Sequence, residues 1–134
     1  MDMVLARQRA RDARVGRLGT VTPDGRPHLV PVCFALLEDV AYTAVDGKPK
    51  STRELRRLQN IESTPATSLL VDHYEEAWTQ LWWIRLDGSA RIVSSAAEAE
   101  RAELALRAKY PQYEHVAVPG PVIALEVAAW GMWP

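Results

Sequence analysis

Hydrophobic and polar residues alternate along short segments of this chain, which is the pattern of strands buried on one face. Residues 15–22 and 26–37 are predicted strands, joined through Pro23-Asp24-Gly25. Proline presets φ in such a turn and glycine accepts a positive φ, so the two strands form a predicted hairpin. Pro27 and Pro31 lie in the second strand and donate no ladder hydrogen bond. We therefore expect that strand to lie at a sheet edge, to be bulged, or to turn part of its backbone away from other strands.

The same alternation predicts five further strands, at residues 40–45, 67–72, 78–86, 89–93 and 122–130. Asp87-Gly88 is a typical signal of a tight hairpin between the third and fourth of these strands. Helices are predicted over residues 3–14, 51–63 and 95–110, and the last two begin with a serine and a glutamate spaced as in a capping box. The prediction is one mainly β (α+β) domain over residues 1–134: a small antiparallel barrel with a short N-terminal helix and two connecting helices.

Composition is that of an ordinary globular domain. The chain has 134 residues, a net charge of −1, a pI near 6.3 and one cysteine. No apolar run is long enough to cross a membrane, and the charged residues near the N-terminus argue against a signal peptide. We expect a cytoplasmic protein that binds neither nucleic acid nor membrane. Three scattered histidines and a single cysteine argue against a metal site.

The positive charge is concentrated in the ten residues from Lys48 to Arg57, which hold five of the sixteen basic side chains and one acid, a net charge of +4. This segment includes the start of a predicted helix, where free N–H groups and the helix dipole favour an anion. Arg56, Arg57 and Asn60 share one face of that helix. Arginine adds directional, charge-assisted hydrogen bonds. The segment therefore predicts a site for an anionic ligand, with Lys50 as a further cation.

The sequence offers few groups for catalysis. It has no nucleophile elbow, Walker loop, Rossmann glycine pattern or paired carboxylates, so no catalytic residue is assigned. Cys33 has no basic neighbour and is expected to be a small strand hydrophobe. Trp82 and Trp83 are neighbours in a predicted strand, so one faces the core and the other faces outward. A dimer partner or a flat ring ligand would cover the outward indole, whereas Trp130 and Trp133 fit either the core or a substrate pocket.

Several motifs follow one another in the order found in a known family. Residues 19–27 read GTVTPDGRP, residues 56–61 read RRLQNI, residues 64–69 read TPATSL and residues 84–90 read IRLDGSA. Across roughly residues 14–93 the chain therefore resembles the split-barrel flavin and deazaflavin oxidoreductases, the pyridoxamine-phosphate-oxidase-like superfamily. The basic segment and the strand around Trp83 resemble most the branch assigned to the deazaflavin coenzyme F420.

The resemblance implies a homodimer of split antiparallel β-barrels, with two cofactor sites at the subunit interface and a small-molecule substrate. It implies that Arg56 and Arg57 bind the cofactor phosphate. It also implies that Trp83 approaches the ring system from the partner strand. The remaining cofactor-binding residues are expected to be Pro31, Val32 and Cys33 on the second strand, Asn60, and the cations Lys48 and Lys50.

Three functions follow from this resemblance. The first is hydride transfer from reduced F420 to an unsaturated small molecule, because Lys48 and Lys50 suit a cofactor with an extended polyanionic tail. The second is an FMN-dependent oxidase or reductase of the same fold. The third is a non-catalytic carrier of a deazaflavin, haem or another anionic ring. The chain ends at Pro134 without the arginine-bearing segment that grips the substrate phosphate in true pyridoxamine-phosphate oxidases, which argues against that activity.

Overall fold

The computed structural model describes residues 1–45, 52–118 and 120–134, and for residues 52–55 it describes the backbone alone. Within these residues seven strands form one sheet in the order β2-β1-β5-β6-β7-β4-β3, and every neighbouring pair is antiparallel. The strands are β1 Gly16–Val21, β2 Pro27–Val32, β3 Ala35–Leu37, β4 Val40–Ala44, β5 Ala66–His73, β6 Trp82–Ile92 and β7 Val122–Trp133. The α-helices are α1 Met3–Asp12, α2 Thr52–Ser63 and α3 Ala96–Lys109, with short 3₁₀ turns η1 Trp78–Gln80 and η2 Pro111–Glu114.

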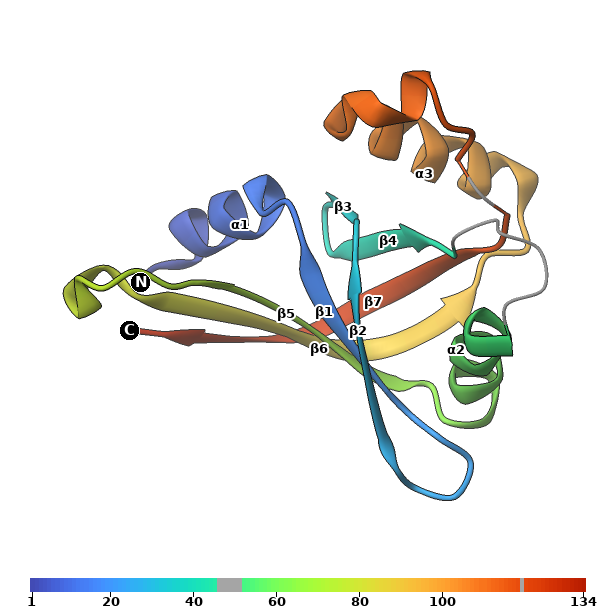
Figure 1. The fold of residues 1–134 in the computed structure, drawn as a ribbon, viewed down its shortest axis with the longest axis horizontal. Helices are drawn as coiled ribbons and strands as arrows, with labels where there is room; N and C mark the ends of the chain where they lie inside the picture. Colours follow the sequence, from blue (N-terminus) through green and yellow to red (C-terminus); the bar gives the residue numbers. More distant parts are fainter. Residues whose placement is uncertain (46–51, 119) are drawn as a thin grey trace.

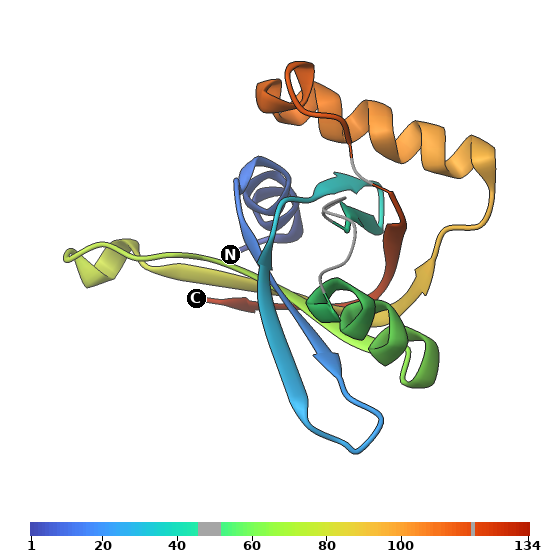
Figure 2. The same ribbon diagram turned by 45° about the vertical axis from the view of Figure 1, so that its right-hand side comes forward.

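The sheet curls around a core that the helices help to close (Figures 1 and 2). The predicted class, a mainly β barrel-like domain with an N-terminal helix and two connecting helices, is confirmed. β5, β6 and the end of β7 extend beyond the body as a long arm, with α1 beside it and α2 and α3 at the other end of the molecule (Figure 1). The described helices include none that is long and apolar enough to span a membrane.

The helices pack small or apolar side chains onto the sheet, α1 and α2 on its inner face and α3 on the opposite face beside β3 and β4. Ala6 and Ala10 of α1 are fully buried in the main core cluster, beside Leu18 of β1. Ile61 of α2 and Leu106 of α3 enter two smaller clusters. Burial of each large apolar side chain contributes about 1.5–3 kcal/mol. The helices are therefore held mainly by their inward faces.

The predicted strand over residues 26–37 is wrong as a single element, because the chain breaks it into β2 and β3. At the break, the Phe34 N–H donates to the Tyr110 hydroxyl oxygen at 3.1 Å, and that hydroxyl lies 3.1 Å from the Phe34 carbonyl oxygen. A side chain from beyond α3 thus replaces a neighbouring strand at this point. Two of the expectations from the prolines hold: β2 is an edge strand, and the backbone turns away from other strands at its end.

The predicted hairpin at Asp87-Gly88 is also wrong, since β6 runs unbroken through it. Residues 78–80 form the turn η1 instead of the start of a strand. Gly88 lies at a bulge in the β6–β7 ladder, where a Cβ would stand 1.9 Å from the Glu126 carbonyl oxygen. The glycine therefore serves close backbone approach rather than a turn. The predicted number of strands is right because this merger offsets the break at Phe34.

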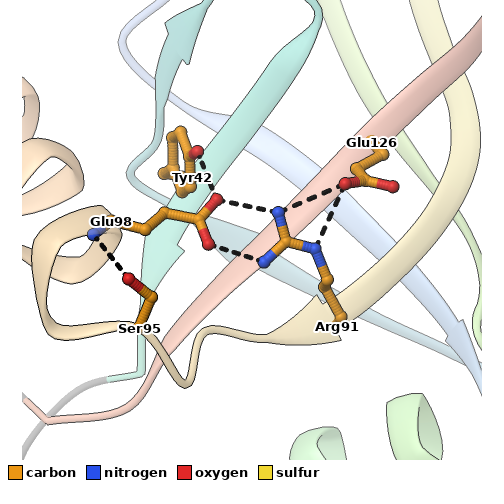
Figure 3. Close-up of polar contacts among 5 residues, drawn as sticks. All are labelled: Tyr42, Arg91, Ser95, Glu98 and Glu126. Atoms are coloured by element: carbon orange, nitrogen blue, oxygen red, sulfur yellow. Dashed lines mark hydrogen bonds and ion pairs between the residues drawn. The ribbon is translucent and has the colours of Figure 1, made fainter.

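A polar cluster ties α3 to three strands (Figure 3). The guanidinium of Arg91 on β6 donates two 2.7 Å hydrogen bonds to Glu98 on α3, and the Tyr42 hydroxyl of β4 donates another at 2.7 Å. Arg91 also contacts Glu126 of β7 at 3.2 Å, and Ser95 caps the helix as predicted. The hydrogen bonds from Arg91, and then that from Tyr42, lower the pKa of Glu98 to about 2. Glu98 is therefore an ionised anchor of α3.

Candidate functional site

The basic helix α2 is fastened to the sheet by Asn60. Its side chain is 2 % exposed, and its Nδ2 donates to the Thr20 hydroxyl on β1 at 3.2 Å. A buried amide is costly unless it is hydrogen-bonded, so this pair specifies how the helix sits on the barrel. Ile61, the next residue, is also buried. The sequence prediction that Asn60 lies on a ligand-facing surface therefore needs refinement, because its side chain points into the protein.

Arg56 and Arg57 precede this anchor by about one helical turn. Arg56 is exposed and Arg57 is half-buried, and both belong to the same described helix. The donor set fits a phosphate, since two guanidinium groups offer planar, charge-assisted hydrogen bonds. The predicted contributions of Lys48 and Lys50 fall outside the described residues. The phosphate role of the arginine pair stays a prediction.

The three residues predicted on the second strand lie at the end of β2 and alternate in exposure. Pro31 and Cys33 are exposed, whereas Val32 is 6 % exposed and belongs to the main core cluster. The Cys33 carbonyl accepts a 2.7 Å hydrogen bond from the Thr43 hydroxyl. A ligand at this strand would therefore meet the side chains of Pro31 and Cys33 but not that of Val32.

Trp82 and Trp83 face opposite ways, as the sequence predicts. Trp82 packs against the core cluster, and the Arg9 guanidinium of α1 lies 5.0 Å from its ring centroid. Trp83 lies on the other face and lines an open hollow of about 440 Å³ together with Trp133. Leu70 of β5 and Arg85 of β6 also line it. The outer face of the arm therefore carries an aromatic hollow in the size range of small-molecule sites.

Charges around this hollow are paired. The Arg17 guanidinium contacts the Asp72 carboxylate at 2.9 Å, and Arg85 Nε lies 2.9 Å from both carboxylate oxygens of Asp87. Partial burial acts to raise the pKa of Asp87, but hydrogen bonds from Ser68 and Arg85 outweigh it and hold that pKa below its ordinary value. Asp87 is therefore ionised and neutralises Arg85. Sequence reasoning missed both residues, although their alternation with buried Ile84 and Leu86 would have placed them on the outward face.

A second hollow, of about 390 Å³, lies farther along β1, β5 and β6. Gly19, Ser68 and Gly88 line it together with Asp87. Neither of the two hollows includes Arg56 or Arg57. Strand pairing relates Pro31 to Arg17, Arg17 to Leu70 and Leu70 to Arg85, so Pro31 shares a sheet face with the aromatic hollow. The structure thus brings Pro31 and Trp83 to one face and leaves the arginine pair apart from both hollows.

These features define a small curled-barrel protein with a basic helix and an outward aromatic face. A family model described as pyridoxamine 5'-phosphate oxidase matches residues 5–134, so the chain belongs to this family. The resemblance seen in the sequence is thereby confirmed at the level of the superfamily. Among curated proteins no sequence gives a significant match.

Solved structures with low sequence identity share the fold. A conserved hypothetical protein of Mycobacterium tuberculosis has a TM-score of 0.76 at 19 % identity, covering 99 % of this chain and 84 % of the other. An FAD-binding protein of Mesorhizobium loti has a TM-score of 0.76 at 16 % identity, covering 98 % and 92 %. The haem storage protein HutZ of Vibrio cholerae has a TM-score of 0.73 at 14 % identity, again covering 98 % and 92 %.

Proposed function

We propose that this protein binds a flavin-type cofactor and is an oxidoreductase dependent on F420, reducing an unsaturated small molecule. The observation that carries the proposal is the buried Asn60–Thr20 hydrogen bond, which holds the helix bearing Arg56 and Arg57 in one position on the barrel. Family membership adds that barrels of this kind carry cofactors. A fixed pair of guanidinium groups is preorganised for the phosphate of such a cofactor, which reduces the cost of ordering on binding.

In this proposal the bound deazaflavin supplies the hydride. The protein's own residues bind, orient and exclude water. Arg56 and Arg57 neutralise the anionic tail of the cofactor. The outward Trp83 shields a bound aromatic ring from solvent. Among the described residues we assign no proton donor, so the proton is expected to come from water.

A homodimer is part of the proposal. The arginine pair does not line the aromatic hollow, and the outer face of the sheet exposes Trp133 and Tyr74 on the arm and Leu29 on β2. A second copy set against this face would bring the separated elements to one interface, with the aromatic hollow left between the two chains. Light scattering after size exclusion should give twice the 15.0 kDa mass of one chain. A monomer mass would remove the interface placement of the cofactor.

The binding test compares F420 with FMN by equilibrium dialysis and by the absorption spectrum of freshly purified protein. We expect F420 to bind and FMN to be retained poorly, whereas a yellow, FMN-loaded protein would favour the FMN-dependent reading. Arg57→Ala should weaken F420 binding by roughly tenfold or more, a loss of about 1.4 kcal/mol. Arg57→Lys should restore only part of this affinity, because a point charge replaces a planar fork.

Arg107→Ala is the control, since Arg107 is a helical arginine away from α2, exposed and paired with Glu103 on α3. It should leave F420 affinity unchanged. If Arg57→Ala keeps its circular dichroism spectrum and binds F420 as the wild type does, the anion site lies elsewhere.

A non-catalytic carrier is the second candidate. It is favoured by the shortage of assignable acids and bases among the described residues and by the two named neighbours, one FAD-binding and one a haem storage protein. Cofactor-loaded protein that transfers no hydride to a broad panel of quinones, enones and tetrapyrroles would support it. Turnover with any of them would exclude it.

A further inference from the structure

Two side chains that line the aromatic hollow, Trp83 and Arg85, lie close over one glycine of the neighbouring strand. A Cβ at Gly131 of β7 would lie 3.5 Å from Trp83 Cζ3 and 3.3 Å from Arg85 Nη2. Both side chains of β6 therefore extend across the neighbouring strand in close contact with its backbone. The Arg85 guanidinium carbon stands 5.7 Å from the Trp83 ring centroid, which keeps the indole and the guanidinium together. Trp133, 47 % exposed, provides a second aromatic wall.

The electrostatics of the hollow exclude a strongly charged guest. Its lining includes one cation, Arg85, and one carboxylate, Asp72, in addition to His73. Arg85 is neutralised by Asp87 and Asp72 by Arg17, in hydrogen-bonded ion pairs of 2.9 Å. An anionic or cationic ligand would lose hydration here without gaining an unpaired counter-charge. A planar apolar ring loses little hydration and gains two indole contacts.

We propose that this hollow binds an uncharged, planar, conjugated molecule, and that this is the substrate class of the protein. The assignment of this molecule as the substrate rests on the proposed function, whereas its binding rests on the geometry of the hollow. It separates two tasks in the molecule. The charged cofactor is held through Arg56 and Arg57, and the neutral ring is held at Trp83 and Trp133.

Equilibrium dialysis with two probes that share one ring tests the charge preference. Menadione is neutral, and naphthoquinone sulfonate carries one anionic group on the same ring system. Every protein carries Cys33→Ser, because Cys33 is exposed and thiols add to quinones. We expect menadione to bind at least roughly tenfold more tightly than the sulfonate. Equal affinity for the two probes would overturn the proposal.

Variants at Gly131 locate the site. Gly131→Ala should displace Arg85 by a few tenths of an ångström and leave Trp83 in ordinary van der Waals contact, whereas the larger side chain of Gly131→Val should displace both, so menadione affinity should fall in that order. Gly120→Ala is the matched control, because nothing lies within 4 Å of a Cβ there. Trp133→Ala should also weaken menadione binding. Menadione binding that is unchanged in both Gly131→Val and Trp133→Ala would overturn the proposal, as would a second copy that covers the hollow and leaves it unable to bind menadione.

Asp87→Asn tests whether charge sets the ligand preference of the hollow, because the affinity of a simple apolar patch for the sulfonate would not respond to this change. It keeps the size of the side chain and one accepting oxygen for Ser68 and Arg85, but leaves Arg85 without its neutralising charge. The sulfonate should gain affinity while menadione changes little. Absence of that gain in a folded variant would overturn the electrostatic argument.

Arg57→Ala separates this proposal from the proposed function. It should weaken F420 binding and leave menadione binding intact. If the protein binds no F420 but prefers menadione to the sulfonate as predicted, the hollow remains a binding site and the cofactor assignment is wrong.

Discussion

Replacing Glu98 by glutamine tests how α3 is held to the barrel. Glu98 accepts two 2.7 Å hydrogen bonds from Arg91 and one from Tyr42, and its side chain is 13 % exposed. These contacts lower its pKa from 4.5 to about 2, led by the hydrogen bonds from Arg91. Glutamine keeps the shape and removes the charge. Because the amide nitrogen of glutamine donates and cannot accept, the variant removes the charge together with one hydrogen bond from Arg91.

The size of the effect follows from the pKa shift. A difference of this size between folded and unfolded chain corresponds to about 3 kcal/mol of stability above the unfolded pKa. Arg91 is 42 % exposed, so water screens part of the attraction and about 2 kcal/mol is the expected net loss in Glu98→Gln at neutral pH. Because the folded pKa is the lower one, wild type loses this stabilisation as the pH falls from 4.5 through about 2.

Urea unfolding of wild type and Glu98→Gln, followed by circular dichroism at several pH values, measures the difference directly. The difference in free energy of unfolding between the two proteins should be widest at neutral pH and should narrow towards pH 2. Glu103→Gln is the matched control on the same helix, where an exposed pair with Arg107 contributes only about 0.3–0.5 kcal/mol. A loss in Glu103→Gln equal to that in Glu98→Gln, or a gap that persists in acid, would refute the reasoning.

Three further predictions concern the fold. Asn60→Ala should lower the free energy of unfolding by about 1–3 kcal/mol, measured with urea, because its buried threonine partner loses its hydrogen bond. Gly88→Ala should destabilise the protein far more than Gly120→Ala in thermal melts, since only the first places a Cβ against the Glu126 carbonyl. Burial lowers the pKa of Lys109 to about 8, so wild type should gain stability from pH 8 to 10.5, where only the unfolded chain keeps the proton. In Lys109→Met the free energy of unfolding should show no such rise, and near pH 7 it should be about 1 kcal/mol higher than in wild type. Urea unfolding near pH 7 and at pH values between 8 and 10.5 measures both effects.

The fold was largely predictable because alternation and capping are local signals. The capping serine of α3, the Gly25 turn and the edge position of β2 follow from residues that are close in sequence. The two errors arose where distant parts of the chain decide the outcome. Tyr110 ends the second predicted strand from beyond α3, and the close approach of β7 sets the need for Gly88. Neither contact is visible in a local pattern.

The candidate site was predictable in its chemistry but not in its geometry. Cationic and aromatic candidates could be named from the sequence, since arginine pairs and adjacent tryptophans stand out there. Helical periodicity grouped Asn60 with the arginines, yet its side chain turns inward to Thr20. No sequence pattern pointed to Gly131. Its importance depends on Trp83 and Arg85, whose side chains extend from β6 over the neighbouring strand β7.

The separation of charge and ring recognition constrains the proposed chemistry. Hydride transfer needs donor and acceptor atoms about 3–3.5 Å apart. An anionic tail held at Arg57 on α2 and a neutral ring held at Trp83 on the arm start from different parts of one chain, and neither hollow spans both. They meet if the cofactor reaches from α2 to the outer face that carries Pro31 and Trp83, or if a second copy sets its arm against the first copy's helix. In both cases the protein contributes by holding two flat rings in contact while its ion pairs stay satisfied. In this proposal the neutral pairing of Arg85 with Asp87 therefore matters as much as the arginines proposed to bind the tail.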